Sequence, residues 1–452
     1  MSIIRQGSLF SLEELYDLEP THRFEEVFST VDIYPILVVV SKKSVYGAPV
    51  ELNYPAMIYS LVARITERIP TIKDLIKRLK NDFIFRLDCG FLLSDDVPSE
   101  ASYSRMAAKL SESDVLEKVQ EKLLIQAISE GFIQDHNIAI DSTHIAARDQ
   151  APPKEEKVEP KPKKRGRKTK AEHEQWLVEK AEQEANATIY EKTIEDQLDI
   201  TLEELRISTP LTPEWGVKKN SAGKNVFWFG YKSHLAVGTE RQYILQSMLS
   251  SGSQNDGKAA IPLLKGLQER LPNFLVKHAI MDSGYDYAAV YKQVSRIRAQ
   301  SVIAYNKKNE SEPVGFDKHF APTCVREHSY KYDSFDAKYE SLKYTRPKEC
   351  KDCPLAHDSL CQSVYKIRIK TDLRRYTAPA RGSQAWKNVY KERSSVERVI
   401  GYLKSYFQLN NIRYRTGKKA KFHFDLVTLV YNASKLASDR INHRLQEVQE
   451  AA

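Results

Sequence analysis

The chain has 452 residues, with 69 Lys and Arg against 60 Asp and Glu, and a formal net charge of +9. Hydrophobic residues make up 41% and charged residues 29%, which is typical of a folded protein; at roughly 150 residues per domain, two to three domains are expected. No apolar run approaches the roughly 18 residues of a membrane span, and residues 1–10 lack the apolar core of a signal peptide. We therefore expect neither a secreted nor a membrane protein.

The net charge is unevenly distributed along the chain. Residues 1–150 hold 16 basic and 23 acidic side chains, whereas residues 361–452 hold 19 basic and 7 acidic ones. A strongly basic C-terminal end indicates a polyanionic partner, most often nucleic acid, although a solvated basic helix would give the same count.

Residues 1–135 have the pattern of a small helical domain. Apolar residues recur at helical spacing over 54–67, 71–80, 99–110 and 115–128, with Pro70 as a break between the first two segments. The longest apolar stretch, residues 36–40, has the length of a strand.

The pattern then changes to alternating strands and helices. Residues 136–140 predict a buried strand that ends at Asp141, and residues 274–281 predict another that ends at Asp282. Between and after them we expect strands at 226–229, 231–237, 242–250 and 301–304, and helices at 258–270 and 287–298. This alternation indicates an α/β sheet.

Two segments interrupt the predicted sheet region. Residues 150–215 begin with a stretch rich in Pro and Lys and continue into a charged, helix-like stretch, 169–205, so we expect an inserted segment there. Residues 307–380 are irregular, basic and Cys-containing. A long helix over 383–407 and a second one over 423–437 are expected to follow.

Three acids from distant parts of the chain are candidates for one site. Asp141 and Asp282 each follow a strand of the same sheet, and Glu397 lies on the long predicted helix. Carboxylates gathered at the carboxyl edge of a sheet favour hard divalent cations, and two such ions suit phosphodiester chemistry. Each acid also has an ordinary interpretation, as a turn or helix-capping residue or, for Glu397, as an i, i+4 partner of Arg393.

The residues around Glu397 strengthen the site interpretation. On a continuous helix at about 100° per residue, Tyr390, Arg393, Glu397 and Lys404 fall within one arc of about 60°. A stripe with an acid, two cations and an aromatic fits a face that meets metal and phosphate, although a solvated face would also accommodate it.

These residues carry a resemblance to insertion-sequence transposases of the DDE class. One large group of that class has the signature Tyr-x2-Arg-x3-Glu-x6-Lys, which is similar to Tyr390, Arg393, Glu397 and Lys404 with every spacing kept. The segments IAIDSTHI, FGYKSHLAV, SGSQNDGKAAIPLL and MDSGYD also resemble that group, in the expected order, and Asp286 of the last segment is a neighbouring acid.

The resemblance implies an α/β ribonuclease-H-like catalytic core over 131–452, with insertions, after an N-terminal helical DNA-binding or dimerisation domain over 1–130. It implies that Asp141, Asp282 and Glu397 hold two Mg²⁺ (or Mn²⁺) ions for cleavage of transposon ends and strand transfer into target DNA. It also implies double-stranded DNA as partner, a homodimer assembled on that DNA, and a bacterial cytoplasmic location. The alternatives are a metal-dependent nuclease that only cuts and a catalytically silent DNA-binding descendant.

Two basic clusters are further candidates for DNA contact. Arg165 and Arg167, in the run KKRGRK, resemble a minor-groove hook, although a solvated linker or nonspecific phosphate contact fits as well. The second cluster follows the long helix and comprises Arg413, Arg415, Lys418, Lys419 and Lys421.

Four of the five cysteines lie close together in the sequence. Cys350 and Cys353 form a CxxC pair, Cys361 follows, and Cys324 precedes them. Four thiolates of this kind form a structural zinc site, with His328 or His357 as an alternative fourth ligand, or they are simply reduced thiols.

Overall fold

The computed structural model describes residues 19–41, 52–153, 169–219, 222–308, 310–311, 313–355 and 361–451. The chain forms two compact units: unit 1 comprises residues 1–133 and 401–452, and unit 2 comprises residues 134–400. The C-terminal helix, which we expected in the catalytic domain, thus groups with the N-terminal helices.

Unit 1 is helical. Three of its helices, α4, α5 and α7, begin at side-chain caps, because Asn53, Thr71 and Ser99 each accept a hydrogen bond from a backbone N–H in the first turn. Its described helices are α2 (Glu25–Ser29), α3 (Tyr34–Val40), α4 (Tyr54–Thr66), α5 (Ile72–Asn81), α6 (Phe83–Asp88), α7 (Glu100–Ser111), α8 (Val115–Ser129) and α15 (Gly417–Ala451). The four expected helices are confirmed as α4, α5, α7 and α8.

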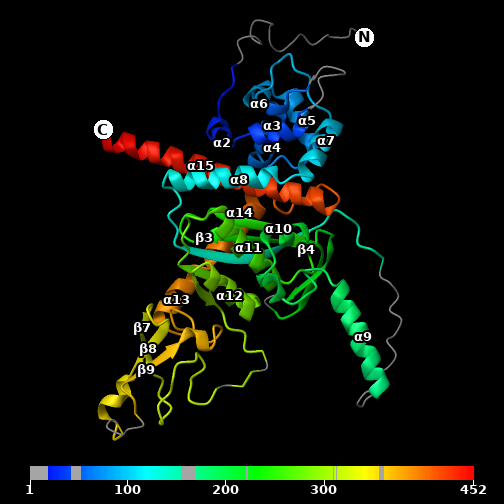
Figure 1. The fold of residues 1–452 in the computed structure, drawn as a ribbon. Coiled ribbons are helices and arrows are strands. Elements are labelled where there is room, and N and C mark those ends of the chain that lie inside the picture. Colours follow the sequence, from blue (N-terminus) through cyan, green and yellow to red (C-terminus); the bar gives the residue numbers. More distant parts are fainter. Residues whose placement is uncertain are drawn as a thin grey trace, which may run out of the picture. The chain divides into compact units, whose positions relative to one another are not determined.

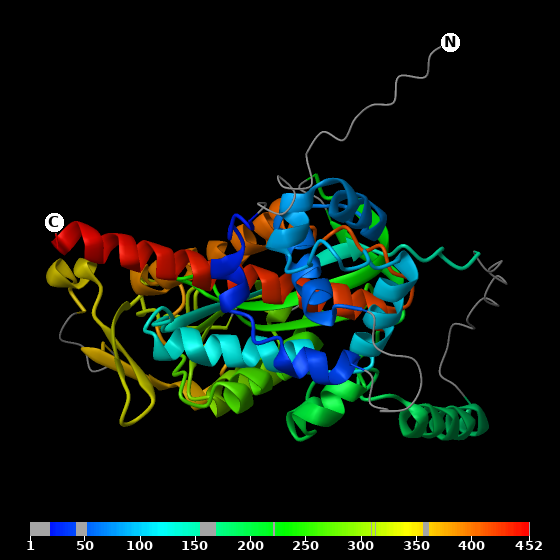
Figure 2. The same ribbon diagram turned by 90° about the horizontal axis from the view of Figure 1, so that it is seen from above.

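Helix α15 is much longer than the 423–437 helix expected from the sequence. It lies beside α8 in both views (Figures 1 and 2) and also packs on α2, α4 and α7. The apolar stretch at residues 36–40, which has the length of a strand, belongs to helix α3, where Pro35 sits in the first turn. No helix in the described ranges is both long enough and apolar enough to cross a membrane.

Unit 2 is built on a mixed sheet of six strands. Its strands are β1 (Asn137–Ala146), β2 (Glu214–Lys219), β3 (Asn225–Gly238), β4 (Ile244–Ser251), β5 (His278–Met281) and β6 (Gln300–Ile303). The order is β2-β3-β1-β5-β6, with β4 also paired to β3. Strands β1, β5 and β6 are parallel, whereas β3 runs antiparallel to β1, β2 and β4. The expected α/β architecture is confirmed at this level.

Three of the described helices pack on this sheet, among them α13 (Gln384–Lys391), which contacts β5 and β6. Helix α11 (Asp256–Arg270) contacts β3 and β4, and α12 (Ala288–Arg296) contacts β6 and α11. Both follow strands of the sheet, and Figure 1 shows them beside it.

The structure also corrects the sequence interpretation within unit 2. Strand β1 continues to Ala146, so Asp141 lies within the strand and not at its end. The segment 307–380 is not irregular throughout, because β7 (Lys331–Asp336), β8 (Ser341–Thr345) and β9 (Val364–Arg368) form a separate antiparallel sheet. The expected helix over 169–205 is α9 (Lys170–Asn186), followed by a 3-10 turn and the short α10 (Leu202–Ile207).

The expected long helix over 383–407 is also interrupted. It consists of α13 (Gln384–Lys391) and α14 (Ser394–Tyr406), with Glu392 and Arg393 in a turn between them. Glu392 is held there because its Oε2 accepts hydrogen bonds from Asn137 Nδ2 (2.8 Å) and Thr239 Oγ1 (2.9 Å). The turn therefore docks onto the beginning of β1 and the end of β3.

Candidate active site

Asp141 and Asp282 lie side by side on neighbouring strands. The parallel pairing of β1 with β5 ends at the pair Ile140 and Met281, so each Asp is the first residue beyond the ladder. Each carboxylate accepts a local backbone hydrogen bond, Asp141 Oδ1 from the N–H of Ser142 and Asp282 Oδ1 from the N–H of Gly284, both at 2.8 Å. These bonds fix both acids at one edge of the sheet.

Arg393 connects the first acid with the third. Its Nη2 lies 2.7 Å from Glu397 Oε1, and its Nη1 lies 3.6 Å from Asp141 Oδ2. Because Arg393 is in the turn that Glu392 docks, the guanidinium reaches the sheet while Glu397 projects from the first turn of α14. The expected i, i+4 ion pair with Glu397 is therefore present, and the same guanidinium also lies beside Asp141.

The electrostatics reflect this convergence. Burial raises the pKa of Asp141 to about 6, and the charges of Asp282 and Glu397 add to that shift against the opposing effect of Arg393. Burial also raises the pKa of Asp282. The three acids are thus close enough to repel one another, and Arg393 offsets only part of that repulsion.

Tyr390 completes the part of the signature that lies in unit 2. Its ring stacks on Trp386 with centroids 4.6 Å apart, and the guanidinium carbon of Arg393 lies 5.9 Å from its centroid. Burial raises the pKa of the Tyr390 hydroxyl, which therefore stays protonated at neutral pH.

The other predicted DNA-contact residues fall elsewhere. Lys404 is on α14 beyond residue 400, and Arg413, Arg415, Lys418 and Lys419 lie between α14 and the first turn of α15, so all five belong to unit 1. Within that unit Lys418 pairs with Glu112 at 2.6 Å. The hook-like Arg165 and Arg167 lie outside the described residues.

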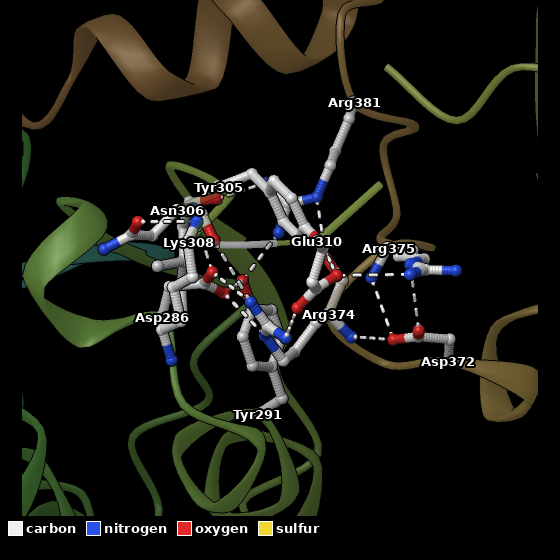
Figure 3. Close-up of polar contacts among 11 residues, drawn as sticks. Asp286, Tyr291, Tyr305, Asn306, Lys308, Glu310, Asp372, Arg374, Arg375 and Arg381 are labelled. Carbon is white, nitrogen blue, oxygen red and sulfur yellow. Dashed lines mark hydrogen bonds and ion pairs between the residues drawn. The ribbon is translucent and has the colours of Figure 1, made fainter. Parts of the chain in front are cut away.

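The acid next to Asp282 in the MDSGYD segment has a separate, structural environment. Asp286 is fully buried and accepts hydrogen bonds from Tyr291 Oη (2.8 Å), the N–H of Asn306 (2.9 Å) and Arg374 Nη2 (2.8 Å). Arg374 Nη1 reaches Glu310 Oε1 at 2.7 Å, which extends the network shown in Figure 3. Asp286 therefore connects the segment after β9 to the loop that carries Asp282. Both of its carboxylate oxygens accept hydrogen bonds within this network.

The sequence interpretation missed Asp256 and Lys232. Asp256 Oδ1 accepts hydrogen bonds from Ser142 Oγ (2.8 Å) and Lys232 Nζ (3.1 Å). Both residues stand in segments that we had noted, SGSQNDGKAAIPLL and FGYKSHLAV, but an Asp at a helix start and a Lys in a strand carry no chemical signal by themselves.

The cysteines of the 307–380 segment come from three loops that contact one another. Arg326 Nη1 lies 4.0 Å from Cys353 Sγ, Arg346 donates to the carbonyl of Cys361 (2.7 Å), and Tyr330 Oη donates to the carbonyl of Gln362 (2.7 Å). Burial raises the pKa of the Cys350 thiol, and the nearby thiols of Cys361, Cys324 and Cys353 add to it. His357 lies outside the described residues.

The carboxylates at the sheet edge are suitable ligands for a hard cation, but in this structure they do not surround a position for one. Among the residues that the structure describes, no three His, Cys, Asp or Glu side chains gather tightly enough to hold a metal ion as they stand. At the sheet edge the Arg393 guanidinium lies between Asp141 and Glu397. The half-buried, mutually repelling carboxylate oxygens are nevertheless the ligand type that Mg²⁺ and Mn²⁺ prefer, so the residues present fit such ions.

Comparison with known proteins gives matches over most of the chain. Residues 199–433 match the model of a family described as the transposase DDE domain, and residues 13–109 match a transposase domain of the DUF772 family. The first match includes Asp282 and Glu397 and begins after Asp141. No curated protein matches the chain. A cryo-EM structure of the piggyBac transposase synaptic complex with hairpin DNA is 11% identical, with a TM-score of 0.36 over 93% of this chain and 73% of that one.

Proposed function

The chain belongs to the transposase DDE-domain family and is a transposase; on this premise we propose that Asp141, Asp282 and Glu397 are its catalytic acids. The observation that carries the proposal is the position of the two aspartates, each the first residue beyond the parallel ladder of β1 and β5, with Arg393 joining Asp141 to Glu397. The sheet, in which the antiparallel strands β2, β3 and β4 lie beside the parallel strands β1, β5 and β6, supports a ribonuclease-H-like core.

Asp141, Asp282 and Glu397 would hold two divalent cations, Mg²⁺ or Mn²⁺. When bound, such ions activate an attacking oxygen and stabilise a leaving oxygen in phosphodiester chemistry. The chain's own residues orient the acids: Ser142 and Gly284 fix the aspartates through backbone N–H groups, and Arg393 positions Glu397. Arg393 can also pair with a DNA phosphate when Asp141 and Glu397 turn to a cation.

The reaction we propose is cleavage of double-stranded DNA at the transposon ends, followed by strand transfer into target DNA. Water is the first nucleophile, and the freed 3′-hydroxyl is the second. Tyr390, Arg393 and Lys404 and the cluster of Arg413, Arg415, Lys418 and Lys419 would contact DNA phosphates, as would Arg165 and Arg167. Because two ends must be held together, a homodimer assembled on DNA is expected.

Substitution of the three acids tests this function. We expect Asp141→Asn, Asp282→Asn and Glu397→Gln each to lower cleavage of transposon-end DNA by about a hundredfold or more, since each removes a charge that holds the cation. Binding of the same DNA, measured by electrophoretic mobility shift, should be retained. Glu269→Gln, an exposed acid on α11, is the matched control.

The products of the same assay separate the alternatives. Cleavage together with joined products supports the transposase reaction. Cleavage without joining points to a nuclease, and binding without cleavage by the unaltered protein points to a silent descendant. Normal cleavage by any one of the three variants would remove that residue from the site.

We also propose that Cys324, Cys350, Cys353 and Cys361 bind a structural zinc ion. The contact of Arg326 with Cys353 and the convergence of the three loops support this. Elemental analysis of purified protein should find about one zinc per chain, and the Cys350→Ser/Cys353→Ser double variant should lose it. Cys89→Ala, a cysteine of unit 1, serves as control, and a folded wild-type protein without zinc would rule the site out.

A further inference from the structure

A fourth acid, Asp256, is connected to the catalytic aspartates on both sides. It is the first residue of α11, and its Oδ1 accepts the hydroxyl of Ser142 at 2.8 Å. Ser142 in turn donates its backbone N–H to Asp141 Oδ1, also at 2.8 Å. One residue of β1 therefore holds Asp141 and Asp256 in a fixed relation.

The second oxygen of Asp256 and the carboxylate of Asp282 both lie near Gly284. A Cβ built on Gly284 would lie 3.0 Å from Asp282 Oδ1 and 3.8 Å from Asp256 Oδ2. The two oxygens therefore border the same small space, which the absence of a side chain at position 284 leaves open. Burial raises the pKa of Asp282, and the charge of Asp256 adds more to this shift than that of Glu397 does.

Lys232 pairs with Asp256 from the Oδ1 side of the carboxylate. Its Nζ lies 3.1 Å from Asp256 Oδ1 and donates to the carbonyl of Gln254 at 2.9 Å, so two contacts hold the ammonium on the Oδ1 side. His234 Nδ1 is 3.8 Å from the same Oδ1, but burial lowers the pKa of His234 to about 4 and the ring is neutral at pH 7. Of the two basic side chains beside Asp256, Lys232 is therefore the one that carries a positive charge at pH 7.

The balance of charge at the site calls for a further cation. Four carboxylates, those of Asp141, Asp256, Asp282 and Glu397, face two cations, Lys232 and Arg393. With all four acids ionised, these six side chains carry a net charge of −2 in a partly buried setting, where unpaired charge is costly. Bound divalent cations would offset this excess of negative charge.

We propose that Asp256 is a fourth metal-binding acid of this site, which binds a divalent cation through Oδ2 together with Asp282 while Ser142 and Lys232 hold Oδ1. This inference rests on the proposed function, because it assigns a further ligand to the same site. The proposal gives two sequence segments a shared role, since SGSQNDGKAAIPLL supplies Asp256 and FGYKSHLAV supplies its counter-ion, Lys232.

Binding of Mn²⁺ to the full-length protein without DNA, followed by electron paramagnetic resonance, tests the proposal independently of activity. We expect Asp256→Asn to weaken Mn²⁺ binding by about tenfold or more, whereas Glu269→Gln on the same helix leaves it unchanged. The amide still accepts a hydrogen bond from Ser142, so the local fold should persist. Wild-type affinity in the folded Asp256→Asn variant would overturn the proposal.

A second variant decides the matter if circular dichroism shows that Asp256→Asn does not fold. Lys232→Met removes the positive charge that competes for Asp256, so Mn²⁺ should bind several-fold more tightly. A merely structural ion pair predicts unchanged or weaker binding, and that result would count against a metal-binding Asp256.

The same titration separates this inference from the proposed function. If Asp141→Asn and Asp282→Asn weaken Mn²⁺ binding and Asp256→Asn does not, the fourth acid is refuted and the catalytic triad stands. If none of the three variants changes Mn²⁺ binding, the catalytic assignment fails with it.

Discussion

In each unit, single side chains determine the local balance of charge. In unit 2, Arg393 serves as an internal counter-ion for Asp141 and Glu397, and Lys232 does the same for Asp256. Such pairs let several acids stay together in the absence of a bound cation, because the mutual repulsion of the carboxylates is partly offset. The signature Arg and Glu are thus linked in space and not only in sequence.

In unit 1, the pKa of a buried histidine predicts how the free energy of unfolding depends on pH. Burial lowers the pKa of His423 to about 3, and its Nε2 lies 3.0 Å from the carbonyl oxygen of Gln408. The unfolded chain takes up a proton near pH 6.5 and the folded chain does not, so stability is lost as the pH falls from about 6.5 toward 3. The loss attributable to His423 at pH 5 is about 2 kcal/mol.

His423→Gln should remove this contribution, because Gln does not titrate and keeps an N–H for the Gln408 carbonyl. Urea unfolding followed by circular dichroism at pH 7.5 and pH 5.0 measures the effect. The wild type should lose about 2 kcal/mol more than the variant between the two pH values. An identical pH dependence of the two proteins would show that His423 is protonated in the folded state.

At the level of helices and strands, the sequence predicts correctly those elements that depend on neighbouring residues alone. Helices α4, α5, α7 and α8 were predicted to within one or two residues, because apolar periodicity and capping residues act over a single turn. The turn between α13 and α14 was missed because it depends on Glu392 meeting Asn137 and Thr239, which are far away in sequence.

The same reasoning explains what the sequence left out of the site. Asp141, Asp282 and Glu397 were predicted from strand ends and a signature, both of which are visible along the chain. Asp256 was not, since its importance depends on contacts with Ser142 and Lys232 across strands β1 and β3. Strands β7 to β9 were missed because each is only five or six residues long, and β7 and β9 have no fully buried residue that would mark them as core strands.

The close packing within the β2–β3 hairpin leads to a prediction about the stability of unit 2. Gly216 is paired with Trp228 across the hairpin, and a Cβ there would overlap the Trp228 indole ring and lie 2.6 Å from the carbonyl oxygen of Gly252. Both obstacles are rigid, so Gly216→Ala should destabilise unit 2 by about 1–3 kcal/mol. A red shift of tryptophan emission should accompany it, as the buried Trp228 becomes exposed to water.

Gly401→Ala is the control for this substitution, because a Cβ at Gly401 meets nothing within 4 Å. It should leave tryptophan emission unchanged. Unchanged stability and emission in Gly216→Ala would mean that β2 does not pack against Trp228 as described.

At the scale of the whole molecule, unit 2 is inserted between the two parts of unit 1. The N-terminal helices bury their apolar faces against α15, which the chain supplies only after residue 416. Unit 1 therefore depends on contacts of very high sequence separation, and its folding must wait for the C-terminal end. Unit 2 has its own sheet and helices within one continuous segment, so we expect it to fold without α15.

Removal of residues 417–452 separates the two units experimentally. The deleted helix carries side chains that are almost completely buried in unit 1, namely Phe422, Phe424, Val427, Leu429, Val430 and Leu436. Each such side chain contributes about 1.5–3 kcal/mol when buried, so their joint loss exceeds the stability of a typical domain. Unit 1 should therefore be unfolded in the truncated protein.

The tryptophans make this outcome measurable, because all four lie in unit 2, at positions 176, 215, 228 and 386. The truncated protein should keep the wild-type unfolding transition in tryptophan fluorescence while it loses much of its helical signal at 222 nm. Limited proteolysis should then degrade residues 1–133 and leave a resistant fragment near 134–400. A truncated protein that keeps its full helical signal and resists cleavage in 1–133 would show that the N-terminal helices form a core without α15.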